Sequence, residues 1–171
     1  MATYKTYTIF LVEDDELYIN AIEKALNKSN ALDIKKFDTG IECLENLHLN
    51  PDIIILDHIL DTKNTDAITG FDLLKQIKST HPEISIIMLS GMDDLEIRVD
   101  SLLSGAFDFI FKDKNSFERL NDSVNKIIST INETSVLNLY KKLAFAISTI
   151  FVIMLALVSV LCYCFPGFFE G

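Results

Sequence analysis

The sequence predicts an α/β fold with a doubly wound, five-stranded parallel sheet, followed by one C-terminal transmembrane helix. Between residues 8 and 131, a short apolar run followed by a helix-spaced apolar stripe occurs five times. This alternation is typical of a parallel sheet covered by helices on both faces. A long run without charge near the end of the chain predicts the membrane helix.

The strands are predicted from their apolar runs. The first, Thr8 to Val12, ends at a cluster of acids, and the second and fifth are expected at Leu32 to Phe37 and Phe107 to Phe111. The third and fourth, Ile53 to Leu56 and Ile84 to Leu89, are nearly continuous apolar runs. Such runs indicate strands that are buried on both faces, so these two strands belong in the centre of the sheet.

Each strand is followed by apolar residues three or four positions apart, the spacing of one face of a helix. The stripes are Leu17, Ala21, Ile22, Ala25 and Leu26; Ile41, Leu44 and Leu47; Phe71, Leu74 and Ile77; Leu95, Val99 and Leu102; and Phe117, Leu120, Val124, Ile127 and Ile131.

The C-terminal run, Leu143 to Phe165, has 23 residues and no charge. A helix of this length reaches roughly 34 Å, enough to cross a hydrocarbon core of about 30 Å. Lys141 and Lys142 precede the run and only Glu170 follows it. By the positive-inside rule, and because Thr8 to Val12 is too short and too closely followed by acids to be a signal peptide, we expect a single-pass protein of the inner (cytoplasmic) membrane with its N-terminal domain in the cytoplasm.

The expected organisation is therefore a globular domain over residues 1–131, a transmembrane helix over 143–165 and a short tail over 166–171. Residues 132–142 begin with a polar stretch. They form either a linker or a helical extension into the span, and the sequence leaves both alternatives open.

The net charge argues against several kinds of partner, and the cysteine content argues against a disulfide framework. Residues 1–140 carry 13 basic and 24 acidic residues, a net charge of −11. This charge repels phosphate backbones and anionic headgroups, so we expect no nucleic-acid partner, and membrane contact must come from residues 143–165. The three cysteines, Cys43, Cys162 and Cys164, are too few and too far apart for a disulfide framework.

Polar residues follow four of the predicted strands. Asp14 and Asp15 follow the first, Asp57 the third, Ser90 the fourth and Lys112 the fifth. The carboxyl ends of parallel strands meet at one edge of the sheet, where ligands bind. Clustered carboxylates favour a hard cation such as Mg²⁺, and a carboxylate, a cation and a hydroxyl together suit the acceptance of a phosphoryl group.

These residues stand in motifs that resemble the receiver domain of bacterial two-component response regulators, over roughly residues 6–131. The matching segments are "FLVEDDE", "PDIIILDHIL", "IIMLSG" and "SGAFDFIFK". The resemblance implies the flavodoxin-like (βα)5 fold and a role in phosphorelay signal transduction as a phosphoacceptor rather than an enzyme.

The resemblance also implies the site. Asp57 would accept a phosphoryl group from a histidine kinase or phosphotransfer protein. Mg²⁺ would be held by Asp14, Asp15, Asp57 and the backbone carbonyl of Ile59. On phosphorylation, Lys112 would bind the phosphoryl oxygens, Ser90 would move toward them, and Phe109, at the position of the family's switch aromatic, would follow Ser90 inward.

Two features depart from the family pattern. Asp113 stands where the family usually has a proline with a cis peptide, so we expect a trans or altered loop after Lys112. The loop after Asp57 is longer than usual and polar, with Asp61, Lys63, Asn64 and Asp66 among its residues. It is either a partner-selecting loop or a tolerated surface insertion.

Other interpretations stay open. The leading hypothesis is a membrane-anchored receiver without a separate output domain. The alternatives are a pseudo-receiver that binds a partner without phosphorylation, and the cytoplasmic head of a larger membrane signalling protein. Homodimer formation is open as well. A Mg²⁺-dependent phosphohydrolase is disfavoured, because such enzymes commonly carry a second aspartate two residues after the nucleophile, where this chain has Ile59.

Overall fold

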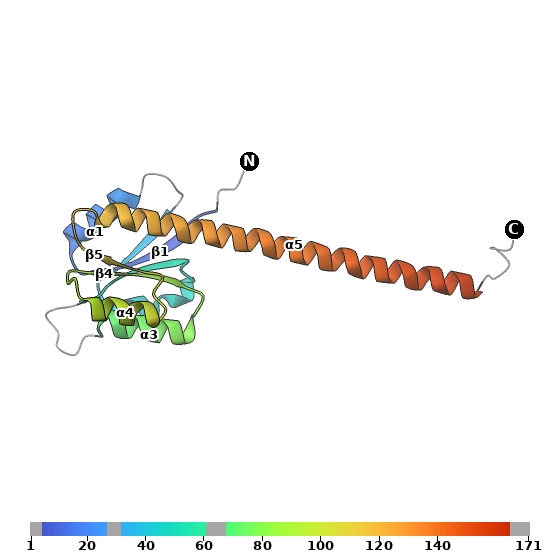
Figure 1. Ribbon diagram of the computed structural model, residues 1–171, viewed down its shortest axis with the longest axis horizontal. Helices are drawn as coiled ribbons and strands as arrows, with labels where there is room; N and C mark the ends of the chain where they lie inside the picture. Colours follow the sequence, from blue (N-terminus) through green and yellow to red (C-terminus); the bar gives the residue numbers. More distant parts are fainter. Residues whose placement is uncertain (1–4, 27–31, 61–67, 165–171) are drawn as a thin grey trace. The chain divides into compact units, whose positions relative to one another are not determined.

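The computed structural model describes residues 5–26, 32–60 and 68–164, with side chains described as far as residue 160 (Figure 1). The chain forms two compact units, Met1–Ile128 and Ser129–Gly171. The first unit contains the whole sheet, and the second consists of helix within the described residues.

The sheet has five parallel strands in the order β2-β1-β3-β4-β5, which confirms the predicted doubly wound architecture with the third strand at its centre. The strands are β1 (Tyr7–Val12), β2 (Leu32–Phe37), β3 (Ile53–Asp57), β4 (Ser85–Ser90) and β5 (Asp108–Phe111).

Two strands continue one residue beyond their apolar runs. Asp57 pairs with Leu89, and Ser90 pairs with Phe111, so both polar residues are the last residues of their strands. The limits of a strand are set by backbone hydrogen bonds to its neighbours. These bonds form whatever the side chain is, so a polar residue can end a strand. Asp57 and Ser90 are therefore held by the sheet itself.

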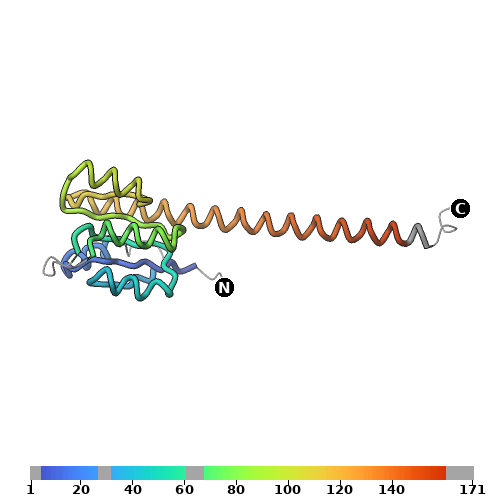
Figure 2. Tube along the Cα trace, turned by 90° about the horizontal axis from the view of Figure 1, so that it is seen from below, coloured from blue at the N-terminus to red at the C-terminus, as the bar shows by residue number. Residues whose placement is uncertain are grey.

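The helices are α1 (Glu16–Leu26), α2 (Gly40–Glu45), α3 (Gly70–Thr80), α4 (Leu95–Leu103) and α5 (Ser116–Cys164), with a 3₁₀ turn at Leu47–Leu49. Thr39 and Thr69 cap α2 and α3, since each hydroxyl accepts a hydrogen bond from the backbone N–H three residues later. Figure 2 shows α2, α3 and α4 following one another across one side of the sheet.

Both faces of the central strand are covered. Ile54 and Leu56 belong to one buried cluster that includes residues of α2 and α3. Ile53 and Ile55 alternate with them and are fully buried against the opposite face, on which α1 and the first turns of α5 lie (Figure 1). This double cover explains why the third and fourth strands are continuous apolar runs in the sequence.

The second unit, from Ser129, is the rest of α5 within the described residues. Residues 132–142 are helical and continuous with the rest of α5. Of the helices in the described part of the chain, α5 is the one long and apolar enough to cross a membrane. Its apolar side chains from Leu143 to Val160 are exposed to their surroundings, unlike those of a core helix in a soluble domain.

Cys43 on α2 gives a test of the packed core. The thiol is fully buried, and burial raises its pKa from 9.0 to about 12. Folding therefore keeps Cys43 as a thiol, and the stability that this contributes is complete below pH 9 and is lost as the pH rises toward 12. We expect iodoacetamide at about pH 8 to leave Cys43 unmodified in the native protein and to alkylate it in urea, as measured by peptide mass spectrometry.

Ile41 lies on the same helix and is 56% exposed. The variant Ile41→Cys provides the matched control, because its thiol should react readily in the native protein. Equal alkylation of Cys43 and this introduced cysteine under native conditions would contradict the buried position.

Candidate functional site

Four polar residues meet at the carboxyl edge of the sheet. Glu13 directly follows β1, Asp57 ends β3, Ser90 ends β4, and Lys112 directly follows β5. Because β1 and β4 flank β3 in the sheet, their ends lie beside the end that carries Asp57. The strand order therefore brings together residues that are up to 99 positions apart in the sequence.

Three carboxylates form the centre of this edge. One carboxylate oxygen from each of Glu13, Asp14 and Asp57 lies within 4.8 Å of the others. Glu13 and Asp57 are buried, at 1% and 6% exposed, while Asp14 is exposed. Carboxylate oxygens are the ligands that Mg²⁺ prefers in proteins, and one exposed member leaves the group open to solvent. The residues present therefore fit a divalent cation.

Lys112 supplies the positive charge of the site. Its Nζ lies 2.6 Å from a Glu13 carboxylate oxygen and 2.9 Å from Oδ1 of Asp57. One half-buried ammonium thus pairs with two buried carboxylates. Burial is tolerated because each charge has an oppositely charged, hydrogen-bonded neighbour.

The two buried carboxylates hold their protons more tightly than usual. Burial is the main cause and raises the pKa of both Glu13 and Asp57, and the Lys112 ammonium opposes this shift. For Lys112, burial works against the charged form, but the hydrogen bond to Glu13 and the charge of Asp57 outweigh it, so the pKa of Lys112 is raised. The ammonium is therefore charged throughout the physiological pH range.

Asp15 does not join the carboxylate group. Its Oδ1 accepts hydrogen bonds from the backbone N–H groups of Leu17, at 2.9 Å, and Tyr18, at 3.3 Å, so it caps the start of α1. The structure thus groups Asp14 with Glu13, one residue earlier than the predicted pair of Asp14 and Asp15. The signal for Glu13 was present in the sequence, because it is the first residue after the apolar strand.

Ser90 and Phe109 both lie on strands of the sheet. The Ser90 hydroxyl is fully buried, donates to the carbonyl of Met92 and accepts from the N–H of Met92, both at 3.1 Å. Phe109 is buried in β5, and the Arg98 guanidinium of α4 lies 5.6 Å from the centre of its ring. Both side chains therefore have partners other than the carboxylate group.

The loop after Lys112 is fixed without a proline. No cis peptide bond occurs in the described part of the chain, so the bond between Lys112 and Asp113 is trans, as expected. Oδ1 of Asp113 accepts from the N–H of Asn115 at 2.9 Å and from the Arg119 guanidinium at 2.8 Å. Asp113 thereby joins β5 to the first turns of α5.

The loop after Asp57 lies largely outside the described residues. Asp61, Lys63, Asn64 and Asp66 all fall in that part, and the backbone carbonyl of Ile59 remains a predicted ligand. The described end of the loop is held at Gly70, whose N–H donates to the carbonyl of His58 at 3.0 Å.

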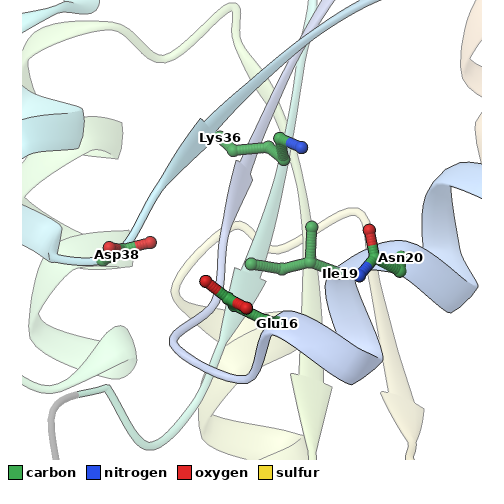
Figure 3. Close-up of a pocket in the computed structure, with 5 residues that line it drawn as sticks. All are labelled: Glu16, Ile19, Asn20, Lys36 and Asp38. Carbon is green, nitrogen blue, oxygen red and sulfur yellow. The ribbon is translucent and has the colours of Figure 1, made fainter.

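A hollow near the site is formed by other residues. It lies between α1 and the end of β2 (Figure 3), and it is lined by Glu16, Ile19, Asn20, Lys36 and Asp38. Neither the three grouped carboxylates nor Lys112 is among these lining residues, so the two features are distinct.

Gly70 is a site residue that the sequence did not single out. A Cβ added there would lie 1.9 Å from the carbonyl oxygen and 2.9 Å from the carbonyl carbon of Asp57. Both are backbone atoms, which cannot move aside as a side chain can. We expect Gly70→Ala to lower the free energy of unfolding by about 1–3 kcal/mol, the usual range for overpacking, and to displace Asp57.

Gly91 is the matched control, because it follows Ser90 at the same edge and an added Cβ would meet nothing within 4 Å. Urea unfolding of Gly70→Ala and Gly91→Ala measures the difference. Equal stability of the two variants would show that the backbone at Asp57 accommodates the methyl group.

Comparison with known proteins agrees with this geometry. A family model for the response regulator receiver domain matches residues 9–125. The regulatory protein LuxO of Vibrio parahaemolyticus is 29% identical over 116 residues, which cover 67% of this chain and 24% of LuxO. The DNA-binding transcriptional regulator NtrC of Escherichia coli is 32% identical over 105 residues, which cover 61% of this chain and 21% of NtrC. The chain thus matches about a quarter or less of the length of these curated relatives.

Solved structures show the same fold. The BeF3-activated receiver domain of DrrB, which comes from Thermotoga maritima, matches 73% of this chain and 99% of its own, with a TM-score of 0.63 and 25% identity. The phosphorylated cyanobacterial phytochrome response regulator RcpA matches 74% of this chain and 96% of its own, with a TM-score of 0.63 and 26% identity.

Proposed function

The chain belongs to the family of response regulator receiver domains, and from this we propose that it accepts a phosphoryl group on Asp57 from a partner histidine kinase or phosphotransfer protein. The observation that carries the proposal is the position of Asp57, which ends β3 within a group of three carboxylates and 2.9 Å from the Lys112 ammonium. A buried carboxylate with its counter-charge in place suits a nucleophile of this kind.

The reaction is a transfer between two side chains. A carboxylate oxygen of Asp57 attacks the phosphorus of a phosphohistidine, a P–O bond forms as the P–N bond breaks, and the electron pair of that bond leaves with the imidazole of the partner. The product is an acyl phosphate on Asp57. Catalysis of such a transfer is mainly positioning and charge neutralisation, and this chain supplies both from the ends of its strands.

Mg²⁺ is the proposed cofactor. The carboxylates of Glu13, Asp14 and Asp57 would hold it, together with the predicted backbone carbonyl of Ile59, while Asp15 caps α1. When bound, the ion offsets the negative charge of the carboxylates and of the incoming phosphoryl group.

In the proposed conformational switch, phosphorylation replaces present contacts of Lys112, Ser90 and Phe109. Lys112 exchanges the Asp57 carboxylate for phosphoryl oxygens. Ser90 turns its hydroxyl from the Met92 backbone to the phosphoryl group, and Phe109, which is already buried in β5, changes its packing beside Arg98. These exchanges alter the surface around α4 and β5 without new secondary structure.

The same proposal places the domain at a membrane. Residues 143–165 would cross the cytoplasmic membrane once, with Lys141 and Lys142 at the cytoplasmic side. The length of α5 and the exposed apolar side chains after Leu143 support this anchor. The N-terminal unit would then act at the cytoplasmic face.

Phosphorylation can be measured on the full chain in detergent micelles. With Mg²⁺ and acetyl phosphate, we expect intact mass spectrometry to show one added phosphoryl group, and Asp57→Asn to abolish it. Asp100→Asn, an exposed aspartate on α4, should leave the labelling unchanged. A folded protein that is never labelled would favour the pseudo-receiver instead.

Membrane anchoring predicts that the full chain resists extraction by alkaline carbonate from bacterial membranes. Ile150→Lys with Met154→Lys should release it, because a lysine at the centre of a span costs about 2.5–3.5 kcal/mol. The paired substitution Val136→Lys with Leu137→Lys lies outside the expected span and is the control. Release of the unaltered chain by carbonate would rule out the span.

A further inference from the structure

Tyr18 lies between the three grouped carboxylates (Glu13, Asp14 and Asp57) and the start of α5. We propose that Tyr18 is a positioning residue whose ring holds the Lys112 ammonium beside Asp57 and whose hydroxyl joins this site to the first turn of α5. The inference rests on the proposed function, because it describes how the phosphoacceptor site is organised and read out.

The ring of Tyr18 is the third partner of the Lys112 ammonium. Nζ of Lys112 lies 4.4 Å from the ring centre, in addition to its contacts with Glu13 and Asp57. An ammonium over an aromatic face is attracted by the ring electrons, more strongly where water is excluded. The two carboxylates and the ring together define where the ammonium sits.

The hydroxyl of Tyr18 reaches the other element. It lies 3.2 Å from Oγ of Ser116, the first residue of α5, and Ser116 is 1% exposed. The ring of Tyr18 also packs on that of Phe117, with 5.3 Å between centres. Burial raises the pKa of Tyr18, so the hydroxyl remains a neutral hydrogen-bonding group. Ser116 and Phe117, the first two residues of α5, thus both contact the Tyr18 side chain.

The start of α1 sets the direction of Tyr18. Asp15 accepts a hydrogen bond from the N–H of Tyr18 and fixes the first turn of the helix. Leu17, the preceding residue, is 81% exposed, whereas Tyr18 is half-buried, so the turn directs Tyr18 to the interior and Leu17 to solvent. The cap formed by Asp15 therefore also orients Tyr18.

The contact also carries the effect of phosphorylation to α5. Asp113 follows Lys112 in this chain, and the Tyr18 ring, Glu13 and Asp57 are the contacts that hold the ammonium. When Lys112 moves to phosphoryl oxygens, it leaves the ring face, and the change passes through the Tyr18 hydroxyl to Ser116. That residue begins the helix that continues to Cys164.

The ring contact can be measured without phosphorylation. Protons of the Lys112 ε-methylene over an aromatic face should resonate upfield in spectra of the full chain with ¹³C-labelled lysine in detergent, with Lys112→Arg used to assign the signal. We expect Tyr18→Leu to abolish the upfield shift and Tyr18→Phe to retain it. An unchanged shift in Tyr18→Leu would overturn the positioning role.

Kinetics test the consequence for Asp57. With acetyl phosphate and Mg²⁺, Tyr18→Leu should lower the labelling rate about tenfold, and Tyr18→Phe should restore most of the loss. Tyr7→Leu is the matched control, since Tyr7 also lies under a lysine, Lys5 at 4.8 Å, at the opposite end of β1. A loss of rate as large in Tyr7→Leu as in Tyr18→Leu would count against the proposal.

Hydrogen exchange tests the link to α5. Phosphorylation should change the exchange of the amides in the first turn of α5, and both Tyr18→Phe and Ser116→Ala should abolish that change. An unaltered response in these two variants would overturn the link. If the unsubstituted chain takes no phosphoryl group, the proposed function fails, while the Lys112 signal still decides the ring contact.

Discussion

The ion pairs of Lys112 with Glu13 and Asp57 are the interaction on which the site depends. Two carboxylates with almost no solvent exposure share one ammonium. In the interior, such a group is stable only while each charge keeps its partner. The sheet makes the arrangement possible, because parallel strands deliver the ends of β1, β3 and β5 to the same edge and hydrogen bonds fix their spacing. Removal of Lys112 leaves both buried carboxylates without their counter-charge.

The strand ends position this group because their apolar runs are buried on both faces. All five residues of β3 are buried, and Asp57 is the last of them. A polar residue at that position cannot turn into the core, so its carboxylate faces the edge. Gly70 then allows α3 to begin directly against the carbonyl of Asp57, which a Cβ would prevent. Core packing and site geometry are therefore consequences of the same strand.

Much of this could be predicted from the sequence, since strand periodicity and the polar residues at strand ends are local signals. Those signals place Asp57 and Ser90 at strand ends, and the β2 limits agree with the predicted Leu32 to Phe37. The structure groups Glu13 and Asp14, whereas the sequence predicted the pair Asp14 and Asp15. Successive acids cannot be told apart by residue type. The turn into α1 is what makes Asp15 a helix cap and separates it from the other two. Gly70 and Tyr18 act through contacts between distant elements, for which local periodicity carries no signal.

The charge balance among Lys112, Glu13 and Asp57 makes the position of the ammonium depend on the charge at Asp57. One ammonium against two carboxylates leaves one negative charge in excess, and Asp14 adds another at the exposed side. Under the proposed function, a phosphoryl group on Asp57 would add still more negative charge, which a divalent cation would offset. Lys112 would then be surrounded by more oxygen acceptors than it has N–H donors. Its position is thus sensitive to the state of Asp57. Because the same ammonium lies on the Tyr18 ring, a change of charge at Asp57 becomes a change of packing at Ser116.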